Sequence, residues 1–489
     1  MPVEPAEQPG PLLPGTGTPR SGVTAEEEGI FDAVADGFPA AVSALGRLVR
    51  IPSVAFPGFP KEPLLRSADA VAELLRGTGA FELVDVRRAE YEAEDGRVAG
   101  SPAVVARRAP APGRPTVLLY AHHDVQPAGR DELWTTPPFE PTLQGERLHG
   151  RGASDDKAGV VTHVAAVTAA LQALGDDLGV GIAIFIEGEE EAGSRSFDAF
   201  LADNHDLLEA DVIVVADSDN VSTSVPALTS SLRGNATATL EIATLGHASH
   251  SGMFGGAAPD AVMAAIRLLS TLWDEDGAVA VEGLASAVPP AGGPAGPSLE
   301  QLTADAALLP GVRPIGRGTV ADRLWYGPSI TVTGIDVTDV VNASNTLLPS
   351  VRVRVSCRIA PGQDAGEAFA ALERHLRAHL PFGAHLAISD VDLGQPFLVD
   401  QSGWAAEAAR GALADGWGAE PELTGIGGSI PFISTLTERF PTAQILITGV
   451  EDPDTRAHSP NESQHLGALR KAITAEALLL ARLSRRDAS

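Results

Sequence analysis

The chain has 489 residues, of which 44% are hydrophobic and 20% charged, so it is long enough for about two or three domains with a large core. Its formal net charge of −29 argues against a nucleic-acid partner, whose phosphates need Lys and Arg, and disfavours an anionic membrane surface. The single cysteine, Cys357, excludes an internal disulfide framework and a Cys-rich zinc finger.

The first segment, residues 1–24, begins with a Pro- and Gly-rich stretch that lacks a basic start followed by an apolar core. We therefore expect a disordered leader rather than a secretory signal. No apolar run in the sequence approaches the length of a membrane span. The default expectation is a cytoplasmic protein.

The first buried strand is predicted after helices at 31–49 and 67–76 and strands near 81–86 and 103–107. Residues 115–121 form a continuous apolar run, which is typical of a strand buried on both faces of a mixed or parallel sheet. Because strand residues i and i+2 share a face, His122 and Asp124 should point the same way after this strand. A carboxylate beside a His can orient a metal-bound imidazole, although a hydrogen-bonded strand end would explain this motif alone.

Paired acids follow in residues 150–159, Gly-Arg-Gly-Ala-Ser-Asp-Asp-Lys-Ala-Gly, before a helix predicted over 160–174. Flanking glycines suit a close approach of the backbone to a ligand. Capping of the helix by Asp155 or Asp156 would explain one acid. It explains two acids plus Lys157 less well.

An apolar strand over 180–186 then runs into four carboxylates, those of Glu187, Glu189, Glu190 and Glu191. Carboxylates a few Å apart raise one another's pKa, so we expect a positive charge among them. The simpler alternative is a solvated acidic turn before the helix predicted over 196–208.

A further buried strand over 211–216 ends in Asp217-Ser-Asp219-Asn220. Three separate strand or loop ends therefore carry His, Asp and Glu residues. The sites of α/β proteins are built in this way, at the carboxyl ends of strands.

The pattern changes at about residue 235. Strands at 237–244, 329–337, 351–360 and 386–391 and helices at 259–273 and 366–379 give a β-α-β-β-α-β order, with a Pro- and Gly-rich excursion at 277–318. The alternation of helices and buried strands seen before residue 235 then returns, with a helix at 403–417, a buried strand at 443–450, His458 and a helix at 466–483. We therefore expect a main domain from 25–233 and 397–489 and an inserted domain from 234–396.

Together these motifs resemble the di-zinc exopeptidase superfamily of carnosinase-like dipeptidases, glutamate carboxypeptidases, aminoacylases and succinyl-diaminopimelate desuccinylase. The resemblance covers nearly the whole chain after about residue 30. It implies an α/β fold, in which a mixed-sheet zinc exopeptidase catalytic domain carries an inserted α+β, ferredoxin-like lid that also dimerises. It also implies two Zn²⁺ per subunit, although Mn²⁺ or Co²⁺ could occupy the same ligands.

The resemblance assigns roles residue by residue in the catalytic domain. Glu190 would be the general base, and Asp124 would orient a ligand. Asp155 would bridge the two metals. The implied metal ligands are His122, Asp155, Glu191, Asp219 and His458.

In the lid, the resemblance implies that His250 reaches the active site of the partner subunit and stabilises the oxyanion. Arg358 would bind the substrate carboxylate. Gly428 and Ser429 match a Gly-Gly-Ser-Ile-Pro loop that closes over that carboxylate.

The implied function is hydrolysis of a dipeptide or short peptide with a free carboxylate by a homodimer, in the carnosinase-like branch. An amidase that releases an acyl group from an N-acyl amino acid is the alternative on the same scaffold. A non-catalytic metal- or peptide-binding protein is a rival of another class, against which the intact Glu190 stands. An assembly protein that uses the lid only to dimerise would leave the strand-end acids unexplained.

Overall fold

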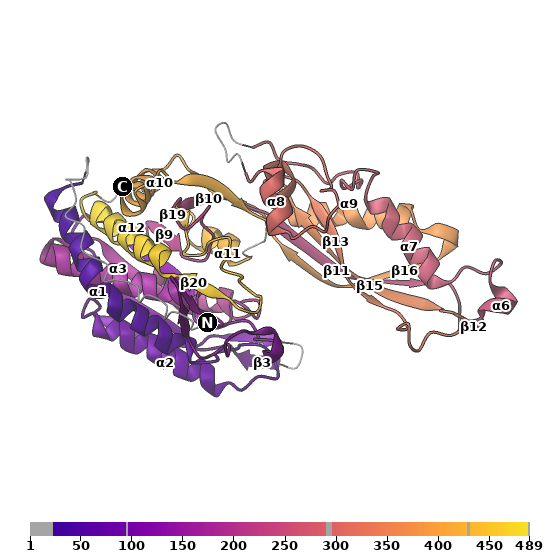
Figure 1. Ribbon diagram of the computed structural model, residues 1–489, viewed down its shortest axis with the longest axis horizontal. Coiled ribbons are helices and arrows are strands. Elements are labelled where there is room, and N and C mark those ends of the chain that lie inside the picture. Colours follow the sequence, from indigo (N-terminus) through magenta and orange to yellow (C-terminus); the bar gives the residue numbers. More distant parts are fainter. Residues whose placement is uncertain (1–22, 94–95, 290–295, 428–430, 488–489) are drawn as a thin grey trace, which may run out of the picture.

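The computed structural model describes residues 23–93, 96–289, 296–427 and 431–487, and shows two bodies joined end to end (Figure 1). Nearly all of the leader predicted at 1–24 lies outside the described residues, as do Gly428 and Ser429. The first described helix, α1 (Ala25–Val49), is capped by the side chain of Thr24.

A six-stranded mixed sheet forms the centre of the larger body. Its order is β1 (Leu83–Arg87), β4 (Ala103–Arg108), β8 (Gly181–Glu187), β5 (Thr116–His122), β9 (Val212–Val215) and β19 (Gln444–Ile447). The first three pair antiparallel, whereas β8, β5, β9 and β19 run parallel. Every residue of β5 and β8 is buried, which explains why both read as unbroken apolar runs. The carboxyl ends of the parallel strands meet at one edge.

Helices cover both faces of this sheet. The helices on one face are α1, α2 (Glu62–Gly77), α3 (Lys157–Leu174), α10 (Trp404–Trp417) and α12 (Leu466–Ser484), and those on the other are α4 (Phe197–Asp203), α5 (His205–Leu208) and α11 (Pro431–Arg439). Within the described ranges, only α3 with its extension to Asp177 is long and apolar enough to cross a membrane. More than half of that window is buried, and α3 packs on α1, α12 and β5 as a core helix does.

Several short elements surround the sheet and were not predicted. They are the hairpin of β2 (Glu90–Ala93) and β3 (Gly96–Ala99), the sheet of β6 (Thr142–Gln144), β7 (Arg147–His149) and β20 (Ser463–His465), and the sheet of β10 (Ala227–Leu232), β17 (Phe397–Leu398) and β18 (Glu422–Ile426). Strand β20 matters below, because its pairing with β7 brings the C-terminal segment against residues 147–149.

The smaller body is the predicted inserted α+β domain. Its sheet has the order β13 (Ser329–Asp336), β15 (Ser350–Ile359), β11 (Gly234–Ala243) and β16 (His385–Gly394), all antiparallel. Helices α7 (Ala261–Leu269) and α9 (Ala365–Ala378) cover one face. At its ends lie α6 (Ser251–Phe254), α8 (Leu299–Asp305) and the pair β12 (Ser249–His250) and β14 (Thr346–Leu347). The ferredoxin-like expectation is confirmed; the division of the chain into domains at 233/234 and 396/397 stays a prediction.

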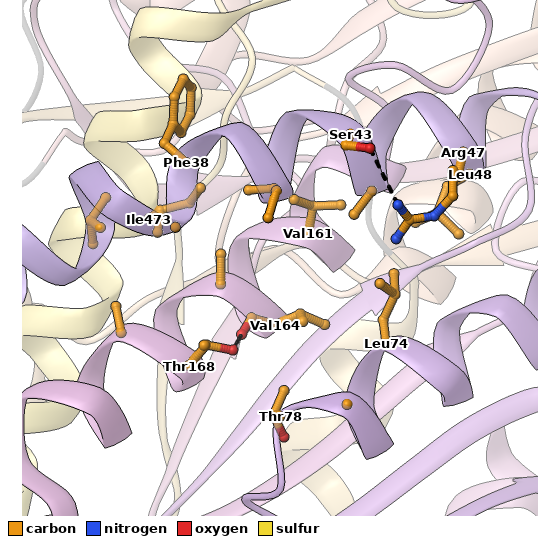
Figure 2. Close-up of a pocket in the computed structure, with 18 of the residues that line it drawn as sticks. Phe38, Ser43, Arg47, Leu48, Leu74, Thr78, Val161, Val164, Thr168 and Ile473 are labelled. Atoms are coloured by element: carbon orange, nitrogen blue, oxygen red, sulfur yellow. Dashed lines mark hydrogen bonds between the residues drawn. The ribbon is translucent and has the colours of Figure 1, made fainter.

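A cavity of about 790 Å³ lies between α1, α2 and α3 (Figure 2). Its walls are mainly Ala, Val and Leu side chains, and Ile473 of α12 closes one side. Arg47 and Glu73 are its only charged lining residues, and none of the predicted site residues reaches it. With a single carboxylate and no histidine in its lining, this cavity lacks the set of groups needed to hold a catalytic metal.

The central sheet should dominate stability. Ile184, fully buried in β8 against the helices, should cost about 2–5 kcal/mol of unfolding free energy when changed to Ala, because truncation leaves a cavity. Ile335, 49% exposed in β13, is the matched control, and Ile335→Ala should cost less than about 0.5 kcal/mol. Urea unfolding followed by circular dichroism measures both; equal losses would contradict this view of the core.

Candidate metal centre

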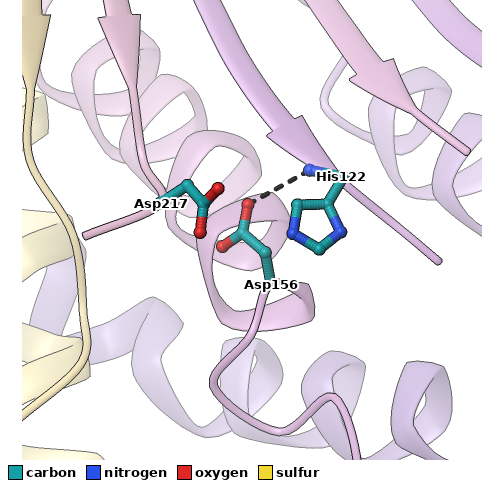
Figure 3. A group of neighbouring side chains, drawn as sticks. All are labelled: His122, Asp156 and Asp217. Carbon is teal, nitrogen blue, oxygen red and sulfur yellow. Dashed lines mark hydrogen bonds between the residues drawn. The ribbon is translucent and has the colours of Figure 1, made fainter. Parts of the chain in front are cut away.

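Two groups of metal-ligand side chains meet at the carboxyl edge of the central sheet. One contains His122, Asp156 and Asp217, from the ends of β5 and β9 and the start of α3 (Figure 3). The other contains Asp155, Glu191 and His458. Within each group the possible ligand atoms all lie within 4.8 Å of one another.

Asp155 joins the two groups. Its Oδ1 lies 3.1 Å from Nε2 of His122, and its Oδ2 lies 2.9 Å from Nε2 of His458. One carboxylate therefore faces two imidazoles, one on each side. Cations held by both groups would share this carboxylate.

His122 is held by Asp124, as the alternation of the strand predicts. Its Nδ1 lies 3.2 Å from the carbonyl oxygen of Asp124 and 3.4 Å from Oδ1 of the same residue. The Asp124 carboxylate also accepts the backbone N–H groups of Glu190 and Glu191, each at 3.1 Å. Asp124 thus fixes the imidazole and the acidic loop relative to one another.

The other ring nitrogen of His122, Nε2, is buried and forms no hydrogen bond with any residue that the structure describes. A buried polar atom without such a partner is uncommon and calls for a ligand, ion or water. Because this nitrogen faces the carboxylate of Asp155, it fits a metal-coordinating role.

Asp156 is turned toward the backbone. Its Oδ2 accepts the N–H of His122 at 3.1 Å, and its Oδ1 accepts the N–H of Gly159 at 3.2 Å, which caps α3 (Figure 3). Helix capping was one explanation considered for the paired acids, and it accounts for Asp156. Asp155 is therefore the acid of this pair whose carboxylate faces the two imidazoles.

The four acids at the end of β8 and directly after it divide into two pairs. Glu187 accepts a 2.6 Å hydrogen bond from the Tyr120 hydroxyl, and Glu189 accepts from the backbone of Ser101 and Ser196. The carboxylates of Glu187 and Glu189 are therefore engaged in hydrogen bonds that hold the surrounding chain in place. Glu190 and Glu191 instead face the cluster.

Glu190 and Glu191 approach different imidazoles. Oε2 of Glu190 lies 4.0 Å from Nε2 of His122, and Oε2 of Glu191 lies 3.1 Å from Nε2 of His458. Gln126 donates to Glu191 through its backbone N–H at 3.1 Å and its side-chain amide at 2.7 Å. Sequence reasoning missed Gln126, although it lies two residues after Asp124 on the same strand-end segment.

The structure groups Asp217, rather than the Asp219 expected from the motif, with His122, and which of the two binds a metal stays a prediction. After β9 the chain forms a parallel bridge between Asp219 and Glu451, and the two carboxyl groups interact there. This bridge takes Asp219 away from His122. Counting from the end of the buried strand, rather than from the Ser-Asp-Asn motif, would have indicated Asp217.

Crowding shifts the protonation of the whole cluster. Burial raises the pKa of Glu190 and of Glu191, and nearby carboxylates add to the effect. The same causes raise the pKa of Asp217 to about 7. Contacts with the carboxylates of Asp155 and Glu191 raise the pKa of His458 to about 10. So many acids in one buried place favour a cation, and nitrogen and carboxylate donors suit zinc, manganese or cobalt.

His250 is not brought to this cluster. It is exposed in β12, paired with Thr346, and its Nδ1 accepts the N–H of Gly252 at 3.0 Å. Figure 1 places β12 and α6 at the end of the smaller body that is remote from the central sheet.

Arg358 lies at the opposite end of the smaller body, in β15 opposite Asn235 and close enough to Arg233 for their charges to interact. The Arg233 guanidinium donates to the carbonyl oxygen of Gly427 at 3.0 Å.

Comparison with known proteins agrees with this geometry. The family model described as Peptidase family M20/M25/M40 matches residues 118–482. A cysteinylglycine-S-conjugate dipeptidase of Corynebacterium striatum is 36% identical over 381 residues, which cover 77% of this chain and 83% of the relative. A Beta-Ala-His dipeptidase of Rattus norvegicus is 28% identical over 438 residues, covering 86% and 88%.

Solved structures have the same fold. Human carnosine dipeptidase 1 superposes with a TM-score of 0.79 at 25% identity, covering 95% of this chain and all of that chain. The di-peptidase Dug1p of Saccharomyces cerevisiae also gives 0.79, at 21% identity and with the same coverage. The matched residues, 118–482, include every side chain of the two clusters, and the chain belongs to peptidase family M20/M25/M40.

Proposed function

We propose that this metallopeptidase binds two metal ions and hydrolyses dipeptides or short peptides that carry a free carboxylate. The observation that carries the proposal is the Asp155 carboxylate, which lies between Nε2 of His122 and Nε2 of His458. A chain that uses one metal ion would not need a carboxylate shared between two imidazoles.

The proposed ligands form two sets that share Asp155. The second set is the group of Asp155, Glu191 and His458. The first set is His122, Asp155 and Asp217, in which Asp155 replaces Asp156 because the Asp156 carboxylate accepts two backbone N–H groups, whereas Asp155 Oδ1 lies 3.1 Å from Nε2 of His122. When bound, two metals lower the pKa of a water and polarise the scissile carbonyl. The donors are those of zinc sites, and manganese or cobalt remains compatible with them.

Glu190 is the proposed general base. Its side chain is 20% exposed and lies next to His122, so a substrate can reach it. The hydrogen bonds from its own backbone and that of Glu191 to Asp124 fix the direction in which both side chains leave the loop. Glu190 accepts a proton from the attacking water and donates it to the leaving amine.

The substrate carboxylate is assigned to Arg358, with Gly428 and Ser429 closing over it. A guanidinium can bind a carboxylate through two parallel hydrogen bonds. Arg358 lies close to Arg233, which donates to the carbonyl oxygen of Gly427, the residue before Gly428 in the sequence. The positive charge of the neighbouring Arg233 favours an anion at the same place.

A homodimer formed through the lid would explain His250. Within one chain this side chain lies far from the metal cluster, and the neighbouring Met253 and Phe254 are 75% and 48% exposed. A second copy would cover these apolar side chains and bring His250 to the oxyanion of the partner subunit. A cytoplasmic location stays a prediction, as does the absence of nucleic-acid and membrane partners.

The relatives favour dipeptides over N-acyl amino acids, because two of them are named as dipeptidases for cysteinylglycine S-conjugates and for Beta-Ala-His. The amidase alternative uses the same chemistry, so the choice rests on substrate testing.

Glu190→Gln should lower kcat by about 10²–10⁴-fold on dipeptides while leaving two metals bound, because it removes a base and no ligand. The measurement is hydrolysis of a panel of dipeptides and N-acyl amino acids by metal-stripped and zinc- or manganese-reloaded protein, with metal content determined in parallel. Turnover confined to N-acyl amino acids would show an amidase. Metal binding without turnover on either class would favour a binding protein.

Asp217→Asn should weaken metal binding by more than the roughly 10–100-fold expected when a group that merely orients a ligand is lost. Asp219→Asn, two residues away and directed toward Glu451, is the matched control and should leave metal affinity close to that of the unmodified protein. Competition with a fluorescent chelator measures both. The reverse order of effects would restore Asp219 as the ligand.

A further inference from the structure

A buried ion pair, Arg151 with Glu462, connects the loop of Asp155 to the loop of His458. We propose that Glu462 is a positioning residue, which holds Asp155 in place between the two sets of ligands, and that Arg151 couples this support to His458. The inference rests on the proposed two-metal function.

Both carboxylate oxygens of Glu462 accept hydrogen bonds from the loop that contains Asp155. Its side chain is fully buried. Oε1 accepts the backbone N–H groups of Ser154 at 3.0 Å and Asp155 at 3.1 Å. Oε2 accepts the N–H of Gly152 at 2.9 Å and Nη1 of Arg151 at 2.6 Å. The proposed bridging residue is therefore held directly, through its own backbone N–H.

Arg151 connects Glu462 to the loop that contains His458. Its guanidinium is buried beneath the Trp134 ring, 5.4 Å from the ring centre, and Nη2 donates to the carbonyl oxygen of Ser459 at 3.3 Å. Ser459 follows His458 directly. One ion pair thus contacts the backbone of two proposed ligand loops that are about 300 residues apart in sequence.

The Asp155 loop has little room to relax without this support. Gly152 has φ of 77°, and a Cβ built there would lie 2.4 Å from Cγ1 of Val125. The pairing of Ser463 with His149 and the hydrogen bond from Ser154 Oγ to Gln464 anchor the other side. Replacing the carboxylate by an amide puts an NH₂ group opposite the donors of one oxygen, either Ser154 and Asp155 or Gly152 and Arg151, and these buried donors lose their acceptor. With little room on either side, the loop can regain partners only by displacing Asp155.

A displacement of the Asp155 loop would lower the affinity for metal, because it moves a proposed ligand. A small displacement of a residue that positions the reacting groups can cost about 10²-fold in rate. Loss of a group that orients a metal ligand typically costs about 10–100-fold in metal affinity. A residue that only stabilised the fold would lower the melting temperature without this effect.

Glu476 provides a matched control. It is also buried, and it binds Nδ1 of His163 at 2.8 Å across α12 and α3. No hydrogen bond or ion pair that the structure describes joins it to the loops of Asp155 or His458. Glu462→Gln and Glu476→Gln therefore make the same chemical change in two buried ion pairs.

The experiment uses the full chain and measures zinc stoichiometry, zinc affinity by chelator competition, melting temperature and dipeptide hydrolysis. The unmodified protein should bind two zinc ions. Glu462→Gln should bind zinc about 10–100-fold more weakly and recover activity when the zinc concentration is raised. Glu476→Gln should lose melting temperature but keep the unmodified affinity.

Unchanged zinc affinity in Glu462→Gln, or an equal loss in Glu476→Gln, would overturn the inference while leaving the two-metal function standing. Failure of the unmodified protein to bind two ions would overturn the proposed function itself. If Glu462→Gln does not fold, Arg151→Lys serves instead, because it keeps a positive charge but loses the forked contact with Ser459. It too should bind zinc more weakly, and an unmodified affinity in that variant would equally overturn the inference.

Discussion

The structure depends on one electrostatic constraint, the gathering of buried carboxylates around two imidazoles at a single sheet edge. Asp155, Asp217, Glu190 and Glu191 stand close together, and burial with mutual repulsion raises the pKa of the last three. Only Asp155 is held below its usual pKa, because both imidazoles face it. Such a site is stable as a set of anions only when cations occupy it. The family to which the chain belongs and the geometry of Asp155 therefore support the same chemistry.

Most of the protein serves to hold these groups in place. Parallel strands β5, β8 and β9 deliver the side chains to one edge, and strand β19 leads toward His458. Asp124, Gln126 and Glu462 then fix the loops through backbone and side-chain hydrogen bonds. The smaller body carries none of the clustered groups. Its strand β15 contains Arg358, and its strand β12, which contains His250, lies at the end remote from the central sheet. The proposed substrate recognition and dimerisation would therefore involve residues outside the metal cluster.

Much of this arrangement could be predicted from the sequence, because buried strands read as unbroken apolar runs and their ends carry the reactive residues. Residues 115–121 predicted β5 and the orientation of His122 and Asp124 together. Asp219 was expected from the Ser-Asp-Asn motif and Asp217 was overlooked, and the bridge between Asp219 and Glu451, more than 200 residues away, becomes visible only in the structure. Gln126 and Glu462 were missed because their function comes only from contacts with other loops. The short strands β7 and β20 were missed for the same reason.

The proposed sharing of Asp155 by two metal ions can be tested by anomalous diffraction at the zinc edge on crystals of the zinc-loaded full chain. We expect two peaks flanking the Asp155 carboxylate, one beside His122 and Asp217 and the other beside Glu191 and His458. A single peak, or two peaks of which neither touches Asp155, would contradict it.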